Sequence, residues 1–343
     1  MTEKSGYGSV RTWGGPDRGD GTCYLMPDEG RLAVEVALAT GRPLLLRGKP
    51  GCGKSSLAMH VAHELDWRYY EHVVTYRTQA SDLLWTYDTV RRLADAQARA
   101  NGGDELNDHR YVRPGPLWWA YARDSALRRG APPDLAVHGA AAGNGGPQDT
   151  CEEPFVKLNE SRSRDGAVVL IDEIDKADPD VPNGLLVPLG SGKFRVTETG
   201  TVVRMEQRTE PGPAPARHLV VITTNEEREL PQAFLRRCVV ASLPSPGKDR
   251  LVEIARAHLT DEFWDRDQEA LATAVAREVL AAREQADKDG MRAPSTAEFL
   301  DALHACLSLE IRSPADPRWT RLRNLVLLKH QQPEDAAEGD GGR

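Results

Sequence analysis

Residues 48–55 of this chain read GKPGCGKS. The spacing matches G-x-x-x-x-G-K-[ST], in which glycines let backbone N–H groups curl around phosphates at the N-terminus of a helix. The flanking sequence agrees, because Pro43–Leu46 predicts a buried strand directly before the loop and Lys54–Leu65 predicts a helix directly after it. A strand, a phosphate-binding loop and a helix in this order predict an α/β nucleotide-binding fold.

The residues of the loop have expected parts in binding a nucleotide and its metal ion. Lys54 is expected to neutralise the β- and γ-phosphates, and the hydroxyl of Ser55 to coordinate Mg²⁺. Cys52 is either a small bystander or, since a helix N-terminus lowers a thiol pKa, a redox switch. ATP and Mg²⁺ are therefore the expected cofactors. The residues expected to line the nucleotide are Gly48, Lys49, Pro50, Gly51, Cys52, Gly53, Lys54, Ser55 and Ser56.

Two carboxylates end a strongly apolar segment further along the chain. Ala167–Ile171 predicts a buried strand, and Asp172 and Glu173 follow it directly. A charge beside such a run is costly unless it has a partner, and a metal–phosphate cluster would supply one. We expect Asp172 to hold Mg²⁺ and Glu173 to orient and deprotonate an attacking water. The alternative is a solvated acidic turn, since further acidic residues follow.

Polar residues at two later positions extend the same pattern. Leu219–Thr223 predicts another strand, and Asn225 just after it could hydrogen-bond a γ-phosphate or the attacking water. Taken alone, an Asn at a strand end is a turn residue. Arg236 and Arg237 end a short predicted helix, and an arginine supplied across a subunit boundary can stabilise a transferring phosphoryl group. Taken alone, the two arginines would complement the negative end of that helix.

The order of predicted elements divides the chain into two parts. Strands at His72–Tyr76 and Val239–Leu243 and a long helix at Ser81–Ala100 continue the alternation, which predicts a three-layer αβα domain with a parallel sheet. After Pro246 only helical spacing remains, which predicts a small helical lid domain with helices at Lys248–Leu259, Gln268–Ala286, Thr296–Leu309 and Arg318–Leu328. The expected parts are a flexible tail at 1–22, the α/β domain at 23–245 with a flexible insertion at 130–150, the helical lid at 246–330 and an acidic disordered tail at 331–343.

The composition limits the classes of partner. The net charge is −8, from 44 basic and 52 acidic residues, and the basic groups are dispersed, which disfavours phosphate-backbone binding without excluding nucleic acid. The five cysteines include no C-x-x-C pair, so neither a disulfide framework nor a structural zinc site is expected. No apolar run reaches the roughly 20 residues that span a bilayer, and the N-terminus lacks the apolar core of a signal peptide. A cytoplasmic location is therefore expected.

Taken in order, the four elements above resemble the Walker A, Walker B, sensor 1 and arginine-finger motifs of AAA+ ATPases. Over about residues 24–310 the chain is most similar to the MoxR group of that superfamily. The further segments that carry this resemblance are GRPLLL at 41–46, RPGPL at 113–117, IDEIDKAD at 171–178 and ELP at 229–231, with FRV at 194–196 and VVR at 202–204 resembling a hairpin that precedes sensor 1.

The resemblance implies an ATP hydrolase that works as a ring, most often a hexamer, in which Arg237 of a neighbouring copy completes each site. It also implies that hydrolysis remodels or matures a protein client, commonly a von Willebrand factor A domain protein. Two alternatives stay open: a DNA-directed motor resembling the McrB restriction subunit, and an ATP-gated binding switch with little turnover. The presence of Glu173 argues against the switch, because a pure switch needs no general base.

Three features depart from the MoxR pattern. The insertion at 130–150 interrupts a segment that is compact in that group. Arg236 could serve as the finger in place of Arg237. The sensor 2 arginine of the group stands in a Ser-Pro-Arg run, whereas this chain has RAPST at 292–296, so Arg292 is the candidate that the resemblance offers.

Overall fold

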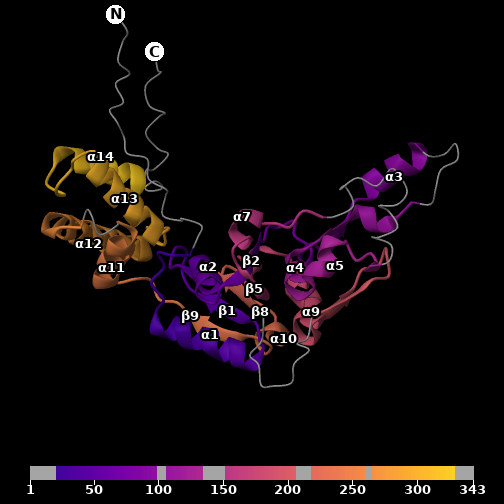
Figure 1. The fold of residues 1–343 in the computed structure, drawn as a ribbon. Coiled ribbons are helices and arrows are strands. Elements are labelled where there is room, and N and C mark those ends of the chain that lie inside the picture. The colour runs from indigo at the N-terminus through magenta and orange to yellow at the C-terminus, as the bar shows by residue number, and fades with distance from the viewer. Residues whose placement is uncertain (1–20, 99–105, 134–150, 206–217, 260–263, 329–343) are drawn as a thin grey trace, which may run out of the picture. The chain divides into compact units, whose positions relative to one another are not determined.

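The computed structural model describes residues 21–98, 106–133, 151–205, 218–259 and 264–328 of the 343 (Figure 1). The described chain forms two compact units. The α/β unit contains residues 26–48 and 57–243, and the helical unit contains residues 21–25, 49–56 and the part of the chain from Pro244 onward. Most of the predicted insertion at 130–150 and of both predicted tails lies outside the described residues.

A five-stranded parallel sheet forms the centre of the α/β unit, in the order β2-β5-β8-β1-β9. The apolar runs of the sequence supply its inner strands, because side chains of a sheet covered on both faces are buried on both. This confirms the predicted α/β class. The strands are β1 (Leu44–Arg47), β2 (Trp67–Val73), β5 (Ser163–Asp172), β8 (His218–Thr224) and β9 (Val239–Ser242).

The register of β5 and β8 brings their polar ends together. Ile171 pairs with Ile222, so the residues that follow each strand leave the sheet at the same level. Ligands of open parallel sheets bind beyond the carboxyl ends of the strands. This edge is therefore the place in the α/β unit to examine for chemistry.

Helices surround the sheet of this unit (Figure 1). Helix α1 packs on β1, β8 and β9, and α4 packs on β2 and β5. Trp118 and Trp119 on α4 are fully buried and help to form the core. The helices are α1 (Asp28–Thr40), α2 (Lys54–Glu64), α4 (Pro116–Tyr121), α5 (Arg123–Leu127), α7 (Val156–Asn159), α8 (Asp180–Gly184), α9 (Leu186–Ser191) and α10 (Gln232–Leu235), with 3₁₀ turns η1 (Ala80–Leu83), η2 (Asp108–Tyr111) and η4 (Ile174–Lys176).

Two predicted elements differ from the structure. The strand predicted at His72–Tyr76 was placed too late, because β2 begins at Trp67 and uses the buried Tyr69 and Tyr70 as its core positions. The long helix predicted at Ser81–Ala100 is wrong. That segment contains η1, the strand β3 (Trp85–Tyr87) and a shorter helix α3 (Thr89–Ala98). The Asp88 carboxylate accepts a hydrogen bond from the Arg91 N–H at 2.9 Å, which starts a new helix at this point.

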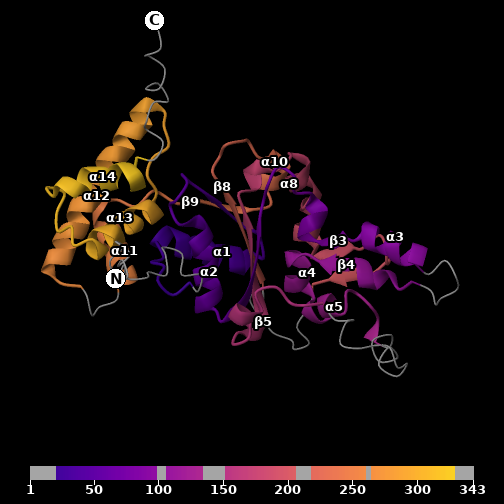
Figure 2. The ribbon, with the colours of Figure 1, turned by 90° about the horizontal axis from the view of Figure 1, so that it is seen from above.

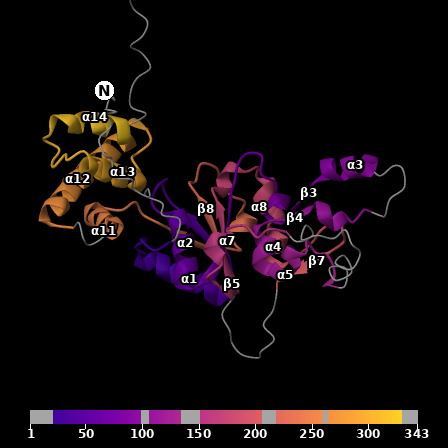
Figure 3. The ribbon, with the colours of Figure 1, turned by 45° about the horizontal axis from the view of Figure 1, so that its top comes forward.

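Helix α3 lies beside β3 and β4 (Val112–Pro114), away from the five-stranded sheet (Figures 2 and 3). It is attached by polar contacts: Arg92 Nε donates to Asp108 at 2.6 Å, and the Tyr111 hydroxyl donates to Asp95 at 2.7 Å. Val90 is 81% exposed, so the apolar positions of α3 are turned outward. This orientation is the reverse of an ordinary amphipathic surface helix.

An antiparallel hairpin packs against the β3–β4 pair. It is formed by β6 (Lys193–Arg195) and β7 (Val202–Arg204), where the sequence resembles the hairpin before sensor 1. The ring of Phe194 stacks on Trp85 of β3 at a centroid distance of 5.7 Å. The side chain of Trp85 also donates its Nε1–H to Glu198 at 2.9 Å. The β6–β7 hairpin therefore packs directly against the β3–β4 pair.

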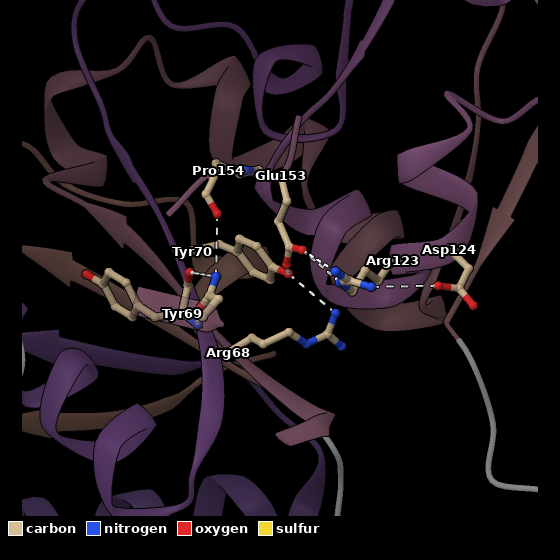
Figure 4. Close-up of polar contacts among 8 residues, drawn as sticks. Arg68, Tyr69, Tyr70, Arg123, Asp124, Glu153 and Pro154 are labelled. Carbon is tan, nitrogen blue, oxygen red and sulfur yellow. Dashed lines mark hydrogen bonds and ion pairs between the residues drawn. The ribbon is translucent and has the colours of Figure 1, made fainter. Parts of the chain in front are cut away.

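A buried polar network ties β2 to the segment that precedes α7 (Figure 4). Tyr70 donates its hydroxyl hydrogen to Glu153 at 2.7 Å, and Arg123 Nε donates to the other oxygen of Glu153 at 2.8 Å. Burial alone would raise the pKa of Glu153, but the hydrogen bonds from Arg123 and Tyr70 lower it below its ordinary value. Glu153 is therefore a carboxylate held in place by two donors, and its role is structural.

The helical unit is built from α11 (Lys248–His258), α12 (Arg266–Asp289), α13 (Thr296–Ser308) and α14 (Pro317–Val326), drawn from orange to yellow in Figure 1. Its core contains Leu251, Val275, Phe299 and Trp319, all nearly inaccessible. Capping boxes at Asp265 and Ser295 fix where α12 and α13 begin. Among the described helices, none combines the length and apolar character needed to cross a bilayer.

Candidate functional site

The phosphate-loop sequence adopts a backbone that only glycine tolerates at two positions. Gly51 and Gly53 have φ of 75° and 93°. A Cβ on Gly51 would lie 2.3 Å from the Ser295 Cβ, and one on Gly53 would lie 3.0 Å from the ring of Tyr24. These glycines therefore allow both left-handed backbone and close packing against neighbouring residues, and it is the left-handed backbone that lets successive N–H groups form an anion-binding nest.

Helix α2 begins at Lys54, so Lys54, Ser55 and Ser56 form its first turn. Lys54 is 7% exposed, and its ammonium donates to the Lys49 carbonyl at 3.1 Å across the loop. A buried ammonium and a helix N-terminus at one loop offer two positive elements to a polyphosphate. The residues present thus fit the phosphates of ATP.

Cys52 is buried within the loop. Burial raises the pKa of its thiol, although the neighbouring charge of Lys54 acts in the opposite direction. The thiol is therefore protonated at neutral pH, which disfavours the reactive thiolate that a redox switch needs.

The carboxyl end of β5 in the α/β unit is an ordered set of polar groups. The Thr223 hydroxyl of β8 donates to Asp172 Oδ1 and accepts from the Glu173 N–H at 2.9 Å. The Val74 N–H, just after β2, donates to the Asp172 carbonyl at 2.9 Å. Thr223 is completely buried, so both acidic residues are fixed by a group inside the sheet. Sequence analysis missed this role of Thr223, although a threonine closing an apolar strand is the signal that could have indicated it.

Glu173 is held in an unusual conformation. Its φ of 59° is left-handed, which is uncommon for a residue with a side chain, although five other such residues of the described chain share it. One carboxylate oxygen accepts from Lys176 Nζ at 2.6 Å and the other from Asn225 Nδ2 at 3.2 Å. The hydrogen bond to Glu173 raises the pKa of Lys176, so the lysine remains charged. The structure thus brings together two of the predicted site residues, Glu173 and Asn225, and adds Lys176.

Asp175 fixes the position of Asn225. It is 2% exposed, and its Oδ2 accepts from the backbone N–H groups of Asn225 and Glu227 at 3.1 and 3.0 Å. A buried carboxylate with two charge-assisted hydrogen bonds holds this turn in a single arrangement. In the sequence Asp175 was one of several acidic residues in a row, and its burial could not be distinguished there.

The acidic edge also fits a magnesium ion that is shared with phosphates. Within the described residues, no three His, Cys, Asp or Glu side chains gather into a group that would hold a metal ion by themselves. Mg²⁺ commonly takes only one or two protein ligands and completes its shell with water and substrate phosphates. In the α/β unit, Asp172 offers a ligand of that kind, and in the helical unit the Ser55 hydroxyl offers another.

The candidate arginines have different surroundings. Arg236 and Arg237 follow α10 and are both exposed, and Arg237 donates to the Ala233 carbonyl at 3.1 Å. Arg292, in the helical unit, lies 3.4 Å from Glu298, whose carboxylate also accepts from the Ser295 N–H at 2.8 Å. Arg292 therefore supports the start of α13 in this structure.

A family model described as AAA domain (dynein-related subfamily) matches residues 43–238. The match covers more than half of the chain. The chain belongs to this AAA family. The matched part of the AAA domain contains the phosphate loop, Asp172, Glu173, Asn225 and both arginines, and it ends before α11, the first of the four helices from Pro244 onward.

Two solved structures also resemble the AAA protein. An ATPase candidate from Cytophaga hutchinsonii is 14% identical with a TM-score of 0.39, covering 87% of this chain and 79% of its own. A glycine variant of RuvB from Thermotoga maritima is 14% identical with a TM-score of 0.40, covering 87% of this chain and 68% of its own. No curated protein matches the chain.

Proposed function

We propose that this AAA protein hydrolyses ATP with Mg²⁺ and uses the energy to remodel or mature a protein client. The observation that carries the proposal is Glu173, a carboxylate in a left-handed conformation whose two oxygens are held by Lys176 and Asn225. A carboxylate positioned in this way is suited to act as a general base toward water. Asp172 and Ser55 would hold the metal ion, which supplies charge neutralisation to the phosphates when bound.

Replacing the base tests hydrolysis separately from binding. Glu173→Gln is expected to lower turnover by about 10²–10⁴-fold, because the amide cannot accept the proton, while affinity for a fluorescent ATP analogue stays near the wild-type value. Glu64→Gln, a change of the same chemistry on an exposed residue at the end of α2, is the matched control and should turn over normally. If Glu173→Gln keeps more than a tenth of the turnover, Glu173 is not the base.

We also propose that the protein works as a ring, hexameric as in the MoxR group, in which Arg237 completes the site of the next copy. What supports this is the exposure of Arg237 and Arg236 after α10. Mixing two inactive variants tests it: Glu173→Gln and Arg237→Ala should each be inactive, yet a mixture should regain turnover at sites that combine an intact base with an intact arginine. The same mixture with Arg236→Ala identifies which arginine acts. Turnover per subunit that stays constant down to nanomolar protein would contradict the ring.

The proposed client is a protein, and a von Willebrand factor A domain protein is the first to test. The chain's net charge of −8 supports a protein client over nucleic acid. Glu173→Gln, loaded with ATP, serves as bait in lysate with and without nuclease. A nuclease-resistant partner that is captured only with ATP supports the proposal. A capture that nuclease abolishes would instead indicate a DNA-directed motor, and a wild-type protein that binds ATP but hardly turns over would indicate a switch.

A further inference from the structure

The phosphate loop of the helical unit is held by two helix ends. The Thr296 N–H at the start of α13 donates to the Gly51 carbonyl at 3.3 Å, and Ser295 packs against Gly51. Two residues earlier in the loop, the ammonium of Lys49 contacts both carboxylate oxygens of Asp287, at 2.6 and 2.8 Å. Asp287 lies in the last turn of α12.

Asp287 stands where its own helix disfavours a carboxylate. The C-terminal end of a helix is partially negative, so an acidic residue there is destabilising and a basic one stabilising. Asp289 is in the same turn but has a partner within the helix, because Gln285 Nε2 donates to it at 2.7 Å. The contact of Asp287 is instead with the phosphate loop, which indicates that its charge acts on the loop.

Lys49 connects this contact to the residue that would bind phosphate. Its backbone carbonyl accepts the ammonium of Lys54, while its own side chain pairs with Asp287. The Lys49 and Asp287 side chains are 60% and 56% exposed, so the pair is bathed in solvent and its strength depends on salt. A pair of this kind can be displaced by an entering polyanion.

We propose that Asp287 competes with the nucleotide's phosphates for Lys49 and thereby lowers the affinity of the loop for ATP. Before a nucleotide binds, the carboxylate neutralises the ammonium of Lys49. When a polyphosphate binds, Lys49 is drawn away and the negative charge of Asp287 is left next to the phosphates, which favours release. This inference rests on the proposed binding of ATP at the loop.

The test compares two carboxylates of one helix turn. Asp287→Asn and Asp289→Asn remove the same charge from the same helix end, but only the first removes the partner of Lys49. Binding of N-methylanthraniloyl-ATP and -ADP is measured by fluorescence at low salt and again near 1 M salt. Asp287→Asn is expected to tighten ATP binding by about two- to fivefold at low salt, with a smaller gain for ADP and none at high salt. Asp287→Glu keeps the charge and should bind like the wild type.

Different results would contradict the competition for Lys49 and the proposed binding of ATP. If Asp287→Asn binds no more tightly than Asp289→Asn at low salt, or if its gain persists near 1 M salt, the competition does not exist. If neither the wild type nor any variant binds the analogue and Lys54→Ala changes nothing, the proposed function itself fails. A double-variant cycle with Lys49→Gln gives a second measure, because the gain from Asp287→Asn should disappear once Lys49 is absent.

Discussion

The acidic edge of the sheet and the phosphate loop both carry charged groups, but they are built in opposite ways. At the edge, Thr223 and Asp175 are buried and each makes two hydrogen bonds to the residues they position. At the loop, the side chains of Lys49 and Asp287 are more than half exposed, and the ion pair described for each is the one between them. The comparison indicates that the groups expected to do chemistry are fixed in advance, whereas the groups expected to adjust binding are left in water.

The largest effect on stability is expected at the buried edge. Asp175→Ala should lower the free energy of unfolding by about 4 kcal/mol, because the two N–H groups of Asn225 and Glu227 lose their buried acceptor. Turnover should fall with it, since Asn225 loses its anchor. Urea unfolding measures the first effect and steady-state hydrolysis the second. Asp178→Ala, the same change at an exposed residue of this segment, should stay within about 1 kcal/mol of wild type. Equal losses in both variants would contradict the expected effect of burial.

The buried network at β2 extends the comparison to a structural site. Glu153→Gln should cost about 3 kcal/mol of unfolding free energy, because Arg123, 20% exposed, loses its carboxylate partner (Figure 4). Asp124 also pairs with Arg123, at 3.9 Å, but is 70% exposed, so Asp124→Asn should cost less than about 0.5 kcal/mol. Urea unfolding of the two variants side by side checks the difference. If Asp124→Asn lowers the free energy of unfolding as much as Glu153→Gln does, burial does not determine the size of the loss at this network.

A pH effect is expected from His218 at the start of β8. Burial lowers the pKa of this imidazole from 6.5 to about 4, so the folded state keeps it neutral. Below pH 6.5 the unfolded chain gains a proton that the folded chain does not, and stability is lost as the pH falls toward 4. At pH 5 the loss should be about 2 kcal/mol. His218→Gln should remove that part of the pH dependence in urea titrations, whereas the exposed His63→Gln should leave it unchanged.

The smallest effect on stability is expected at the loop. Asp287→Asn should change the free energy of unfolding by less than about 1 kcal/mol, and the change should vanish near 1 M salt, because the lost pair is exposed. Thermal melts of the nucleotide-free protein at two salt concentrations measure it. A loss of several kcal/mol would place this pair with the buried groups and end the contrast between the two regions.

Local signals in the sequence predicted the parallel strands and the loop, because each apolar run and each glycine acts on its own neighbourhood. GKPGCGKS, LLL before it and VVLID are patterns of adjacent residues, and they indicated the sheet and its acidic edge. The helix predicted at Ser81–Ala100 was wrong because helical spacing is also a local signal, and it does not report contacts with distant segments. Its spacing concealed Asp88, which caps a new helix, and the pairing of β3 with β4 from a distant segment.

The missing parts of the candidate site are long-range contacts. Asp287 is 238 residues from Lys49, and Thr223 is 51 residues from Asp172. No periodicity or motif reports such a pair, because the partner is chosen by how the strands and helices pack. The outward-turned Val90 of α3 was likewise invisible, since an amphipathic pattern shows that two faces differ and leaves open which of them is turned inward.

The strand order has a consequence for how the protein folds during synthesis. β1, which leads into the phosphate loop, has β8 and β9 as its neighbours: Leu44 pairs with Val221 and Val239. Strands of such distant origin close the largest loops and fold slowly. During synthesis β1 therefore emerges long before either neighbour exists, and its three leucines have no sheet to enter. The strand that leads into the nucleotide-binding loop is therefore synthesised early but paired late. A chain that stops before residue 218 would leave β1 without a partner strand.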